Sequence, residues 1–373
     1  MTFAAFGVTG DLMRLKVLPA LWGLYEKGTL PESTHIVGIS RRHWSDAEFR
    51  SYLHEVLPQA DELLLSRSRF LQGDAEEPAT WAALKEALAG DDTLIYLALA
   101  PILYPKAFAN MRSTGIGARN GRTRVLVEKP FGTSGASARA LYEELRSSFD
   151  EKDIFLVDHY LAKDWIRELG NLSVPRGEIA WAHIRFFETA GVERRGALYE
   201  ELGALRDVGQ NHMLQILAHL VAPHSRTDAL EALALLTPEQ VAKQTARAQH
   251  EGYRDIQNVS RESQTETYFK IRTTLTNPGF EGVELVLEAG KRLPESRKEV
   301  VLELKNGHQM TFSERMNMTD EYELLLSAAL RGDQSLSCSM REVEAGWRFI
   351  DPILAAWAGG TPELTTYVPG AMP

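Results

Sequence analysis

The first forty residues carry the pattern that most restricts the fold of this chain. An apolar run, Thr2–Phe6, leads into the turn-like sequence GVTGD that begins at Gly7. Apolar residues then recur at helical spacing between residues 12 and 27, and His35–Ser40 has the composition of a second strand. A strand, a tight turn, a helix and a second strand in this order predict a βαβ unit, in which a ligand phosphate can lie at the N-terminus of the helix.

The glycine turn leaves two interpretations open. It contains Gly7 and Gly10, whereas the dinucleotide fingerprint G-x-G-x-x-G has three glycines, so a cofactor loop and an ordinary tight turn both fit. The second strand adds an independent signal, because it is followed by Arg41 and Arg42, with no acid before Asp46. NAD sites place a carboxylate there for the ribose hydroxyls, whereas NADP sites use a cation for the 2′-phosphate. A solvated basic turn is the alternative, but together the two features favour NADP.

Further β-rich runs, Thr93–Ala98 and Thr123–Val127, alternate with helical stretches and predict a parallel sheet covered on both faces. With 373 residues, of which 44% are apolar, the chain exceeds the usual size of one domain. We therefore expect an α/β protein with a Rossmann-type dinucleotide-binding domain at residues 1–157. An α+β domain with a mainly antiparallel sheet is expected at residues 158–373. In it, we expect helices at 162–172 and 200–221, and strands at 265–276, 283–289 and 300–305.

The overall charge and the cysteine content argue against several classes of protein. A formal net charge of −10 speaks against a nucleic-acid or membrane-surface binder, because phosphate groups attract a basic excess. The single cysteine, Cys338, excludes an intrachain disulfide and a cysteine-cluster metal site, and it is typical of a reducing compartment. No apolar run reaches the roughly 18 residues of a membrane-spanning helix. We expect a cytoplasmic protein with no leader and, because the histidines are dispersed, no bound metal.

Two stretches place polar side chains directly after apolar strands. In VLVEKPFG the strand ends before Lys129, which is suited to hold a hydroxyl or a phosphate, although a surface ion pair is the commoner role. In IFLVDHYLAK the strand is followed by Asp158, and the next donors are His159, Tyr160 and Lys163. A helix from Tyr160 onward would place His159 and Lys163 on one face, where their donors suit a phosphate monoester. The alternative is a helix that is simply N-capped by Asp158.

A third stretch, residues 185–220, ends in an apolar helix that is interrupted by polar residues. They are Asp207, Gln210, Asn211 and His212. Buried polar groups cost stability unless they are paired or face a cleft. Asp207 and His212 are five residues apart, roughly 140° around a regular α-helix, so the spacing does not show that they meet. A satisfied core histidine remains the default interpretation of His212 from this segment alone.

Taken together, these stretches resemble the glucose-6-phosphate 1-dehydrogenase family. GVTGDLMRLKVLPALWGLYEKGTLP is similar to the family's cofactor loop and first helix, and VEKPFG matches outright. DHYLAK differs by one residue from D-H-Y-L-G-K, RDVGQNH resembles R-D-x-x-Q-N-H, and GKRLPESRKEV resembles G-K-x-L-x-E-R-K-x-E-V. The motifs occur in the family's order from Gly7 to Val300, with weaker similarity over residues 320–350. By this resemblance the chain is identified as a shortened member of the family.

The resemblance implies NADP-dependent oxidation of D-glucose 6-phosphate at C1 to 6-phospho-D-glucono-1,5-lactone, in the oxidative branch of the pentose phosphate pathway. His212 would be the general base, Asp158 would orient its imidazole, and Lys129 would act at the reaction centre. The implied substrate-binding residues are His159, Tyr160, Lys163, Glu188, Asp207 and Lys291. The implied cofactor-binding residues are Gly7, Gly10, Asp11, Lys16, Arg41 and Lys129.

Three departures from the family pattern are visible. Ala162 replaces a glycine. Ser296 stands where a basic residue is expected, which weakens a phosphate contact or lets Arg297 replace it. Residues 307–319 occupy the place of a long insert of sheet strands. The family usually dimerises through that sheet and can hold a second, structural NADP nearby, so both a homodimer and that second site are left open here.

Two other functions remain open. Another NAD(P)-dependent sugar or sugar-phosphate oxidoreductase would share the cofactor loop and the E-K-P motif, but such proteins usually lack DHYLxK and RDxxQNH. A non-catalytic, NADP-responsive relative would be expected to lose the base, its orienting acid or the phosphate-binding residues first, and all of these are present.

Overall fold

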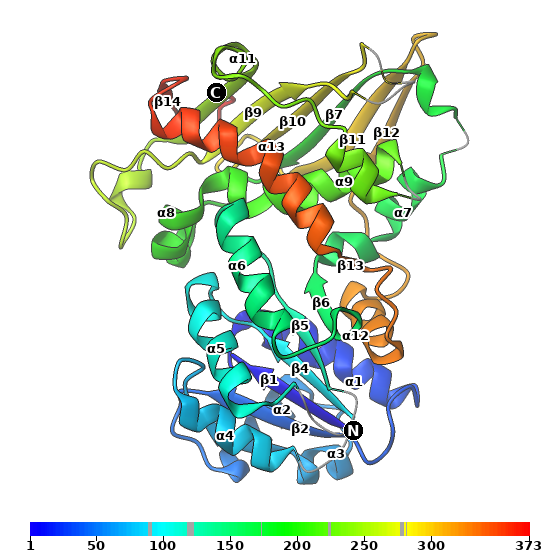
Figure 1. Cartoon of the computed structure of the whole chain (residues 1–373), viewed down its shortest axis with the longest axis vertical. Coiled ribbons are helices and arrows are strands. Elements are labelled where there is room, and N and C mark those ends of the chain that lie inside the picture. The colour runs from blue at the N-terminus through cyan, green and yellow to red at the C-terminus, as the bar shows by residue number, and fades with distance from the viewer. Residues whose placement is uncertain (89–91, 118–122, 173, 223–224, 277–279, 281) are drawn as a thin grey trace. The chain divides into compact units, whose positions relative to one another are not determined.

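The computed structural model describes the chain apart from residues 89–91, 118–122, 173, 223–224, 277–279 and 281. The described residues form two compact units (Figure 1). Unit 1 consists of Met1–Gly132, Ala136–Ala162 and Met318–Cys338, and unit 2 consists of Thr133–Gly135, Lys163–Asn317 and Ser339–Pro373. Unit 1 thus extends slightly past the expected boundary at residue 157. It also takes in residues 318–338, which we expected in the second domain.

Unit 1 contains a seven-stranded sheet in the order β13-β6-β5-β4-β1-β2-β3. Its strands are β1 (Thr2–Phe6), β2 (His35–Ser40), β3 (Arg69–Gln72), β4 (Thr93–Leu97), β5 (Thr123–Val127), β6 (Ile154–Val157) and β13 (Ser337–Cys338). All neighbours are parallel except β13, which pairs antiparallel with β6. Because β1 lies between β2 and β4, the connections run outward on both sides, as in a doubly wound fold. The expected Rossmann-type sheet is confirmed.

In unit 1, residues of this sheet and of several helices form an apolar core. The structure describes the following helices in this unit. They are α1 (Leu18–Glu26), α2 (Asp46–Val56), α3 (Glu62–Arg67), α4 (Pro78–Ala87), α5 (Tyr104–Thr114), α12 (Glu321–Arg331), all but the first residue of α6 (Gly135–Arg146), and the short segments η1 (Met13–Val17), η2 (Pro101–Leu103), η3 (Glu151–Asp153) and η4 (His159–Ala162). The late helix α12 contributes Tyr322, Leu325 and Leu326 to the core, which also contains residues of α1, α2 and α3. Burying a side chain of this size stabilises a fold by roughly 1.5–3 kcal/mol, so the apolar face of α12 explains why residues 318–338 belong here.

Unit 2 contains a second seven-stranded sheet, in the order β12-β11-β7-β10-β9-β8-β14. Its strands are β7 (Ile179–Phe187), β8 (Thr245–His250), β9 (Tyr268–Thr273), β10 (Glu284–Gly290), β11 (Arg297–Leu304), β12 (Gln309–Ser313) and β14 (Leu364–Tyr367). β7 pairs parallel with β10 and β8 with β14, and the other neighbours are antiparallel. The expected mainly antiparallel sheet is therefore confirmed, with strand ends shifted by a few residues.

Helices of unit 2 pack against this sheet and against one another. The long helix α13 (Met340–Ala358), orange to red in Figure 1, contacts α10 (Arg226–Glu231) and α11 (Pro238–Gln244). The helices are α7 (Asp164–Gly170), α8 (Gly196–Ala204), η7 (Leu205–Met213), α9 (Leu214–Val221), α10 (Arg226–Glu231), α11 (Pro238–Gln244), α13 (Met340–Ala358), and the short segments η5 (Arg176–Glu178), η6 (Glu193–Arg195) and η8 (Tyr253–Asp255). None of the helices that the structure describes is long and apolar enough to span a membrane.

The prediction of one regular helix over residues 200–221 is wrong. Gly203 has a non-helical backbone, with φ 67° and ψ 174°, and it separates the first turns from the rest. η7 is a π-helix, with hydrogen bonds from residue i to residue i+5, and α9 continues from it. The expected helix over residues 162–172 likewise begins later, at Asp164, because Lys163 has extended backbone angles.

Candidate functional site

A cavity of about 510 Å³ lies in unit 1 at the carboxyl ends of the parallel strands. Its lining includes Phe6, the last residue of β1, and Gly7 after it, Ile39 and Ser40 at the end of β2, and Ala98 after β4. The strand order reverses between β4 and β2, on either side of β1, and ligands of doubly wound folds bind at such a point. The cavity therefore lies where a dinucleotide would be expected.

The glycine turn forms one wall of this cavity. Gly7 has φ 70°, and a Cβ added there would overlap the carbonyl oxygen of Ala98. The N–H of Gly10 donates to the carbonyl oxygen of Gly7 over 2.9 Å, which closes the turn. Both glycines line the cavity, so the backbone is bare where a ligand would approach. The turn is tight, as one interpretation held, and it also faces a cavity, as the other required.

Two arginines and one carboxylate line the outer part of the cavity. Arg41 and Arg42 follow β2, and Asp74 follows β3. The Nη1 atom of Arg41 lies 4.0 Å from Oδ2 of Asp74, and the Arg41 side chain is 85% exposed. The guanidinium of Arg42 lies 5.0 Å from the ring centroid of Trp44. The sequence between Arg41 and Asp46 contains no acid, but the neighbouring strand brings one in, which the linear pattern could not show.

Asp11 and Lys16, the other predicted cofactor residues near the glycine turn, each form an ion pair. Neither is among the residues that line the cavity. Lys16 lies 3.3 Å from Oε1 of Glu321 on α12, and Asp11 lies 3.4 Å from Arg14. Lys16 thus ties η1 to α12 within unit 1. Their role in cofactor binding stays a prediction.

The EKP motif places a buried acid at the end of β5. Glu128 accepts a hydrogen bond from the hydroxyl of Tyr96, and its own carbonyl oxygen accepts one from Tyr104 over 2.9 Å. Burial raises the pKa of Glu128 to about 7, partly offset by the hydrogen bond from Tyr96 and by the charge of Lys129. The half-buried Lys129 follows and donates its N–H to Glu128 over 3.3 Å. Glu128 was not among the predicted site residues, although the motif contains it.

The DHY segment forms a capped turn instead of the expected helix. Asp158 is buried at the end of β6, and its Oδ1 atom accepts the N–H of Tyr160 over 3.0 Å. The ring of His159 stacks on Tyr322 of α12, with centroids 5.8 Å apart. η4 is a 3₁₀ segment and Lys163 has extended backbone angles, so the expected one-face arrangement of His159 and Lys163 is wrong. The capping interpretation of Asp158 fits the geometry.

The substitution of alanine for glycine in this motif has a simple structural consequence. Ala162 is fully buried, and its methyl group packs into the apolar core of unit 1. The turn therefore accommodates the side chain that the family pattern lacks.

Three predicted substrate residues meet in unit 2. Glu188 follows β7 and Lys291 follows β10, and these strands are parallel neighbours that pair Phe187 with Gly290. The ammonium of Lys291 contacts Glu188 and lies 3.7 Å from Oδ2 of Asp207 on η7. The Lys291 side chain is only 8% exposed, so its charge is neutralised locally by these two acids. The structure thus brings together residues that are far apart in the sequence.

A tyrosine not expected from the sequence adjoins this cluster. The Lys291 ammonium lies 5.9 Å from the ring centroid of Tyr199 on α8. The Tyr199 hydroxyl is buried and has no hydrogen-bond partner among the described residues. Burial, together with the charges of Asp207 and Glu266, raises the pKa of Tyr199 far above its usual value.

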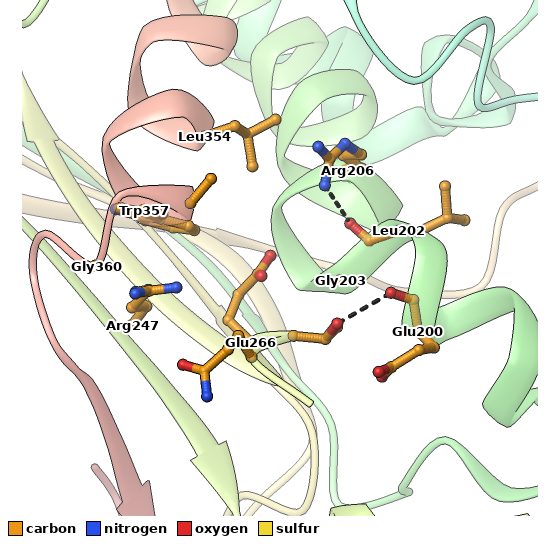
Figure 2. A pocket seen from close by; sticks show the side chains of 12 residues that line it. Glu200, Leu202, Gly203, Arg206, Arg247, Glu266, Leu354, Trp357 and Gly360 are labelled. Carbon is orange, nitrogen blue, oxygen red and sulfur yellow. Dashed lines mark hydrogen bonds between the residues drawn. The ribbon is translucent and has the colours of Figure 1, made fainter. Parts of the chain in front are cut away.

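The helix that carries Asp207 and His212 begins at a second cavity, of about 260 Å³, which Figure 2 shows. Here Glu266 accepts the N–H of Leu205 at its Oε1 atom over 2.9 Å, and its backbone carbonyl accepts the N–H of Ala204 over 3.0 Å. Burial raises the pKa of Glu266. The carboxylate of Glu266, drawn near Gly203 in Figure 2, and its backbone carbonyl each satisfy one N–H group where α8 meets η7. It is a further residue that the sequence analysis missed.

The π-helical hydrogen bonding of η7 changes the relation between Asp207 and His212. In a π-helix, residues five positions apart are about one turn apart, whereas we assumed roughly 140° of separation from a regular helix. Asp207 and His212 are both buried, with exposed fractions of 8% and 3%. The assumption of a regular helix is therefore wrong.

Two models of one protein family match this chain. The family model described as the glucose-6-phosphate dehydrogenase NAD binding domain matches residues 4–168. The model of the C-terminal domain of the same family matches residues 175–319 and 308–372. Its two overlapping matches fit a chain that lacks a segment of the family near residues 308–319.

Individual relatives agree with the family models. A glucose-6-phosphate 1-dehydrogenase of Gluconobacter oxydans is 31% identical over 458 residues, covering 99% of this chain and 93% of the relative. The crystal structure of glucose-6-phosphate 1-dehydrogenase from Mycobacterium avium is similar with a TM-score of 0.82 and 28% identity, covering 99% of this chain and 94% of that one. A glucose-6-phosphate dehydrogenase in complex with glucose 6-phosphate has the same fold, with a TM-score of 0.85 at 24% identity, covering 100% of this chain and 95% of that one.

Proposed function

Because the chain belongs to the glucose-6-phosphate dehydrogenase family, we propose that it oxidises D-glucose 6-phosphate at C1, with NADP as the hydride acceptor. The product is 6-phospho-D-glucono-1,5-lactone, formed in the oxidative branch of the pentose phosphate pathway. The observation that carries this proposal is the meeting of Glu188, Asp207 and Lys291 in unit 2. Two carboxylates and an ammonium offer acceptors and a donor for the hydroxyls of one sugar.

The cavity of unit 1 fits a dinucleotide. Gly7 and Gly10 leave space for a pyrophosphate, and the exposed guanidinium of Arg41 is able to form a bidentate contact with a 2′-phosphate. Arg42 lines the same cavity and adds a second positive charge. When bound, NADP accepts the hydride from C1. Arg41 and Arg42 are the basis for proposing NADP rather than NAD.

The proton of the C1 hydroxyl is assigned to His212. A neutral imidazole near pH 7 can accept it, and a carboxylate can fix the tautomer and stabilise the imidazolium. We assign that carboxylate to Asp158. Both assignments rest on the family resemblance. His159, Tyr160 and Lys163 would bind the phosphate ester, and Lys129 would contact the reacting end of the sugar.

The direct experiment is a spectrophotometric assay at 340 nm with NADP and NAD against a panel of hexose phosphates and unphosphorylated glucose. We expect the fastest turnover with glucose 6-phosphate and NADP. His212→Asn should reduce kcat by a factor of 10² to 10⁴, because a general base contributes about that much, while substrate binding is largely retained. No reduction of either cofactor with any sugar phosphate would refute the proposed activity, and near-normal turnover of the variant would refute the base.

Location and assembly complete the proposal. We propose that the protein acts in the cytoplasm on a small-molecule substrate. A homodimer through the sheet of unit 2 is also proposed, and light scattering of the purified protein would test it. Of the described strands, β12 forms the edge next to β11, so this is the edge that the shortened segment alters.

A further inference from the structure

Alternating charges form a continuous row in unit 2, beyond the three residues already described. In order they are Asp207, Lys291, Glu188, Lys298, Glu314 and Lys163. The Nζ atom of Lys298 lies 3.9 Å from Oε1 of Glu188 and 3.6 Å from Oε2 of Glu314. The Nζ atom of Lys163 lies 2.9 Å from Oε1 of Glu314. Lys298 and Glu314 therefore connect the sugar-binding cluster to the lysine assigned to the phosphate.

The position of Glu314 is set by the backbone. Glu314 directly follows β12, and its N–H donates to the carbonyl oxygen of Lys298 on β11 over 2.8 Å. The same segment is fixed to the start of α7, because Asn317 accepts the N–H of Asp164 over 3.1 Å. An ion pair between Arg315 and Glu168 adds a second tie. Glu314 thus lies between the two lysines because strand pairing and helix contacts hold the segment there.

The alternation of side chains along β11 decides which basic residue reaches this row. Lys298 projects toward Phe186, whose ring centroid lies 5.9 Å from its Nζ atom, and toward Glu314. Arg297 is on the other face of the strand, where it pairs with Glu295 and Glu299. The basic residue missing at position 296 is therefore not replaced by Arg297. Lys298, two positions after Ser296, is the residue of β11 whose cation joins this row.

The Glu314 carboxylate has the contacts that a phosphate ester would make. Its two oxygens contact two different ammonium groups, a bridging arrangement that suits any tetrahedral or planar oxyanion. Lys163, one of the two, is the residue assigned to the substrate's phosphate. The Glu314 carboxylate partly neutralises the Lys163 ammonium and repels a second anion that approaches it, so the carboxylate and the phosphate compete for this lysine.

We propose that Glu314 is an internal competitor for the phosphate of the substrate, and that Lys298 is a phosphate-binding residue together with Lys163. This inference rests on the proposed function and concerns how the same site selects its ligand. A phosphate dianion carries more charge than the carboxylate and displaces it, whereas singly charged or neutral ligands do not. Glu314 thereby lowers the affinity of the lysine pair for anions in general and favours the doubly charged ester.

The test is Glu314→Gln, which keeps the shape and removes the charge. We expect its KM for glucose 6-phosphate to fall three- to tenfold and the inhibition constant of inorganic phosphate to fall with it, while the KM for NADP is unchanged. Lys298→Met should do the opposite and raise both constants at least tenfold. Glu303→Gln is the matched control, because Glu303 pairs with Gln309 on the same two strands but lies outside the row; its constants should equal those of the wild type.

Direct binding of inorganic phosphate, measured by calorimetry, separates this inference from the proposed activity. If no sugar phosphate is oxidised but Glu314→Gln still binds inorganic phosphate more tightly than the wild type, the proposed oxidation of glucose 6-phosphate is refuted. The competition between Glu314 and phosphate is then still supported. If turnover occurs but Glu314→Gln binds phosphate and substrate no better than the wild type, the competition is refuted. An unchanged KM for glucose 6-phosphate in Lys298→Met would overturn the role of that lysine.

Discussion

The carboxylate of Glu266 accepts the backbone N–H of Leu205 over 2.9 Å, and so a residue that precedes β9 caps the helix bearing Asp207 and His212. The chain can turn into this helix because Gly203 has φ 67° and ψ 174°, a region that only glycine adopts readily. A Cβ at Gly203 would also overlap the carboxylate of Glu266. The position of the proposed base therefore depends on a glycine and an acid outside the reaction centre.

Gly203→Ala should destabilise the protein by about 2–4 kcal/mol and lower kcat, because both the backbone angle and the clash with Glu266 act against it. Thermal unfolding and steady-state kinetics would measure this. Gly252→Ala is the control, since Gly252 has φ 80° but no atom within 4 Å of an added Cβ. Equal losses in both variants would show that the contact with Glu266 has no separate effect.

Glu128→Gln should make stability less dependent on pH. The folded-state pKa of Glu128 is raised from 4.5 to about 7, so the folded state binds this proton more tightly than the unfolded state. Its contribution is fully present below about pH 4.5 and is lost as pH rises through about 7, a loss of roughly 3 kcal/mol. Glutamine keeps an acceptor for Tyr96 and carries no charge, so the variant should gain stability over the wild type at pH 8 and much less at pH 5.

Urea denaturation of both proteins at pH 5 and pH 8 would measure this difference. A stability difference that is the same at both pH values would contradict the assigned titration of Glu128.

Arg41→Ala should raise the KM for NADP at least tenfold and the KM for NAD much less, because only NADP has a 2′-phosphate. Asp74→Asn provides the complementary change, since Asp74 lies 4.0 Å from Arg41 and lines the same cavity. Removing its negative charge should lower the KM for NADP. Initial rates at varied concentrations of each cofactor would give the two KM values. Equal changes for NADP and NAD in Arg41→Ala would refute the contact of Arg41 with the 2′-phosphate.

Tyr367→Phe should raise the KM for glucose 6-phosphate severalfold with a loss of about 1 kcal/mol in stability. The Tyr367 hydroxyl donates to the carbonyl oxygen of Lys291 over 2.6 Å, and Thr267 accepts the N–H of the same lysine over 2.9 Å. A buried neutral hydrogen bond contributes about that much, and its loss loosens the backbone that carries Lys291. A change in stability without any change in KM would show that Tyr367 only supports the fold.

The sequence predicted those features that depend on local pattern. The run from Thr2 to Ser40 gave β1, the glycine turn, the following helix and β2, because period and turn chemistry are local properties. The meeting of Glu188 with Lys291 was expected only from the resemblance, and the structure explains it by the parallel pairing of β7 and β10.

Other features depend on tertiary contacts that a linear pattern does not contain. The π-helix of residues 205–213 begins after the non-helical Gly203, and its first N–H donates to Glu266, which is remote in the sequence. The contact of Lys298 with Glu314 depends on the register between β11 and β12. The sequence analysis placed residues 318–338 in the second domain, because the packing of α12 on the N-terminal unit joins segments that are far apart in the chain.

The discontinuous composition of unit 1 has a consequence for biosynthesis. When the first 162 residues have left the ribosome, α12 and β13 have not yet been translated, so the apolar surface beside α1 and the edge of β6 stay uncovered. Both surfaces stay exposed to solvent until Cys338 emerges and α12 and β13 can cover them. Slowing translation between those two points should therefore increase the need for chaperones far more than slowing it afterwards.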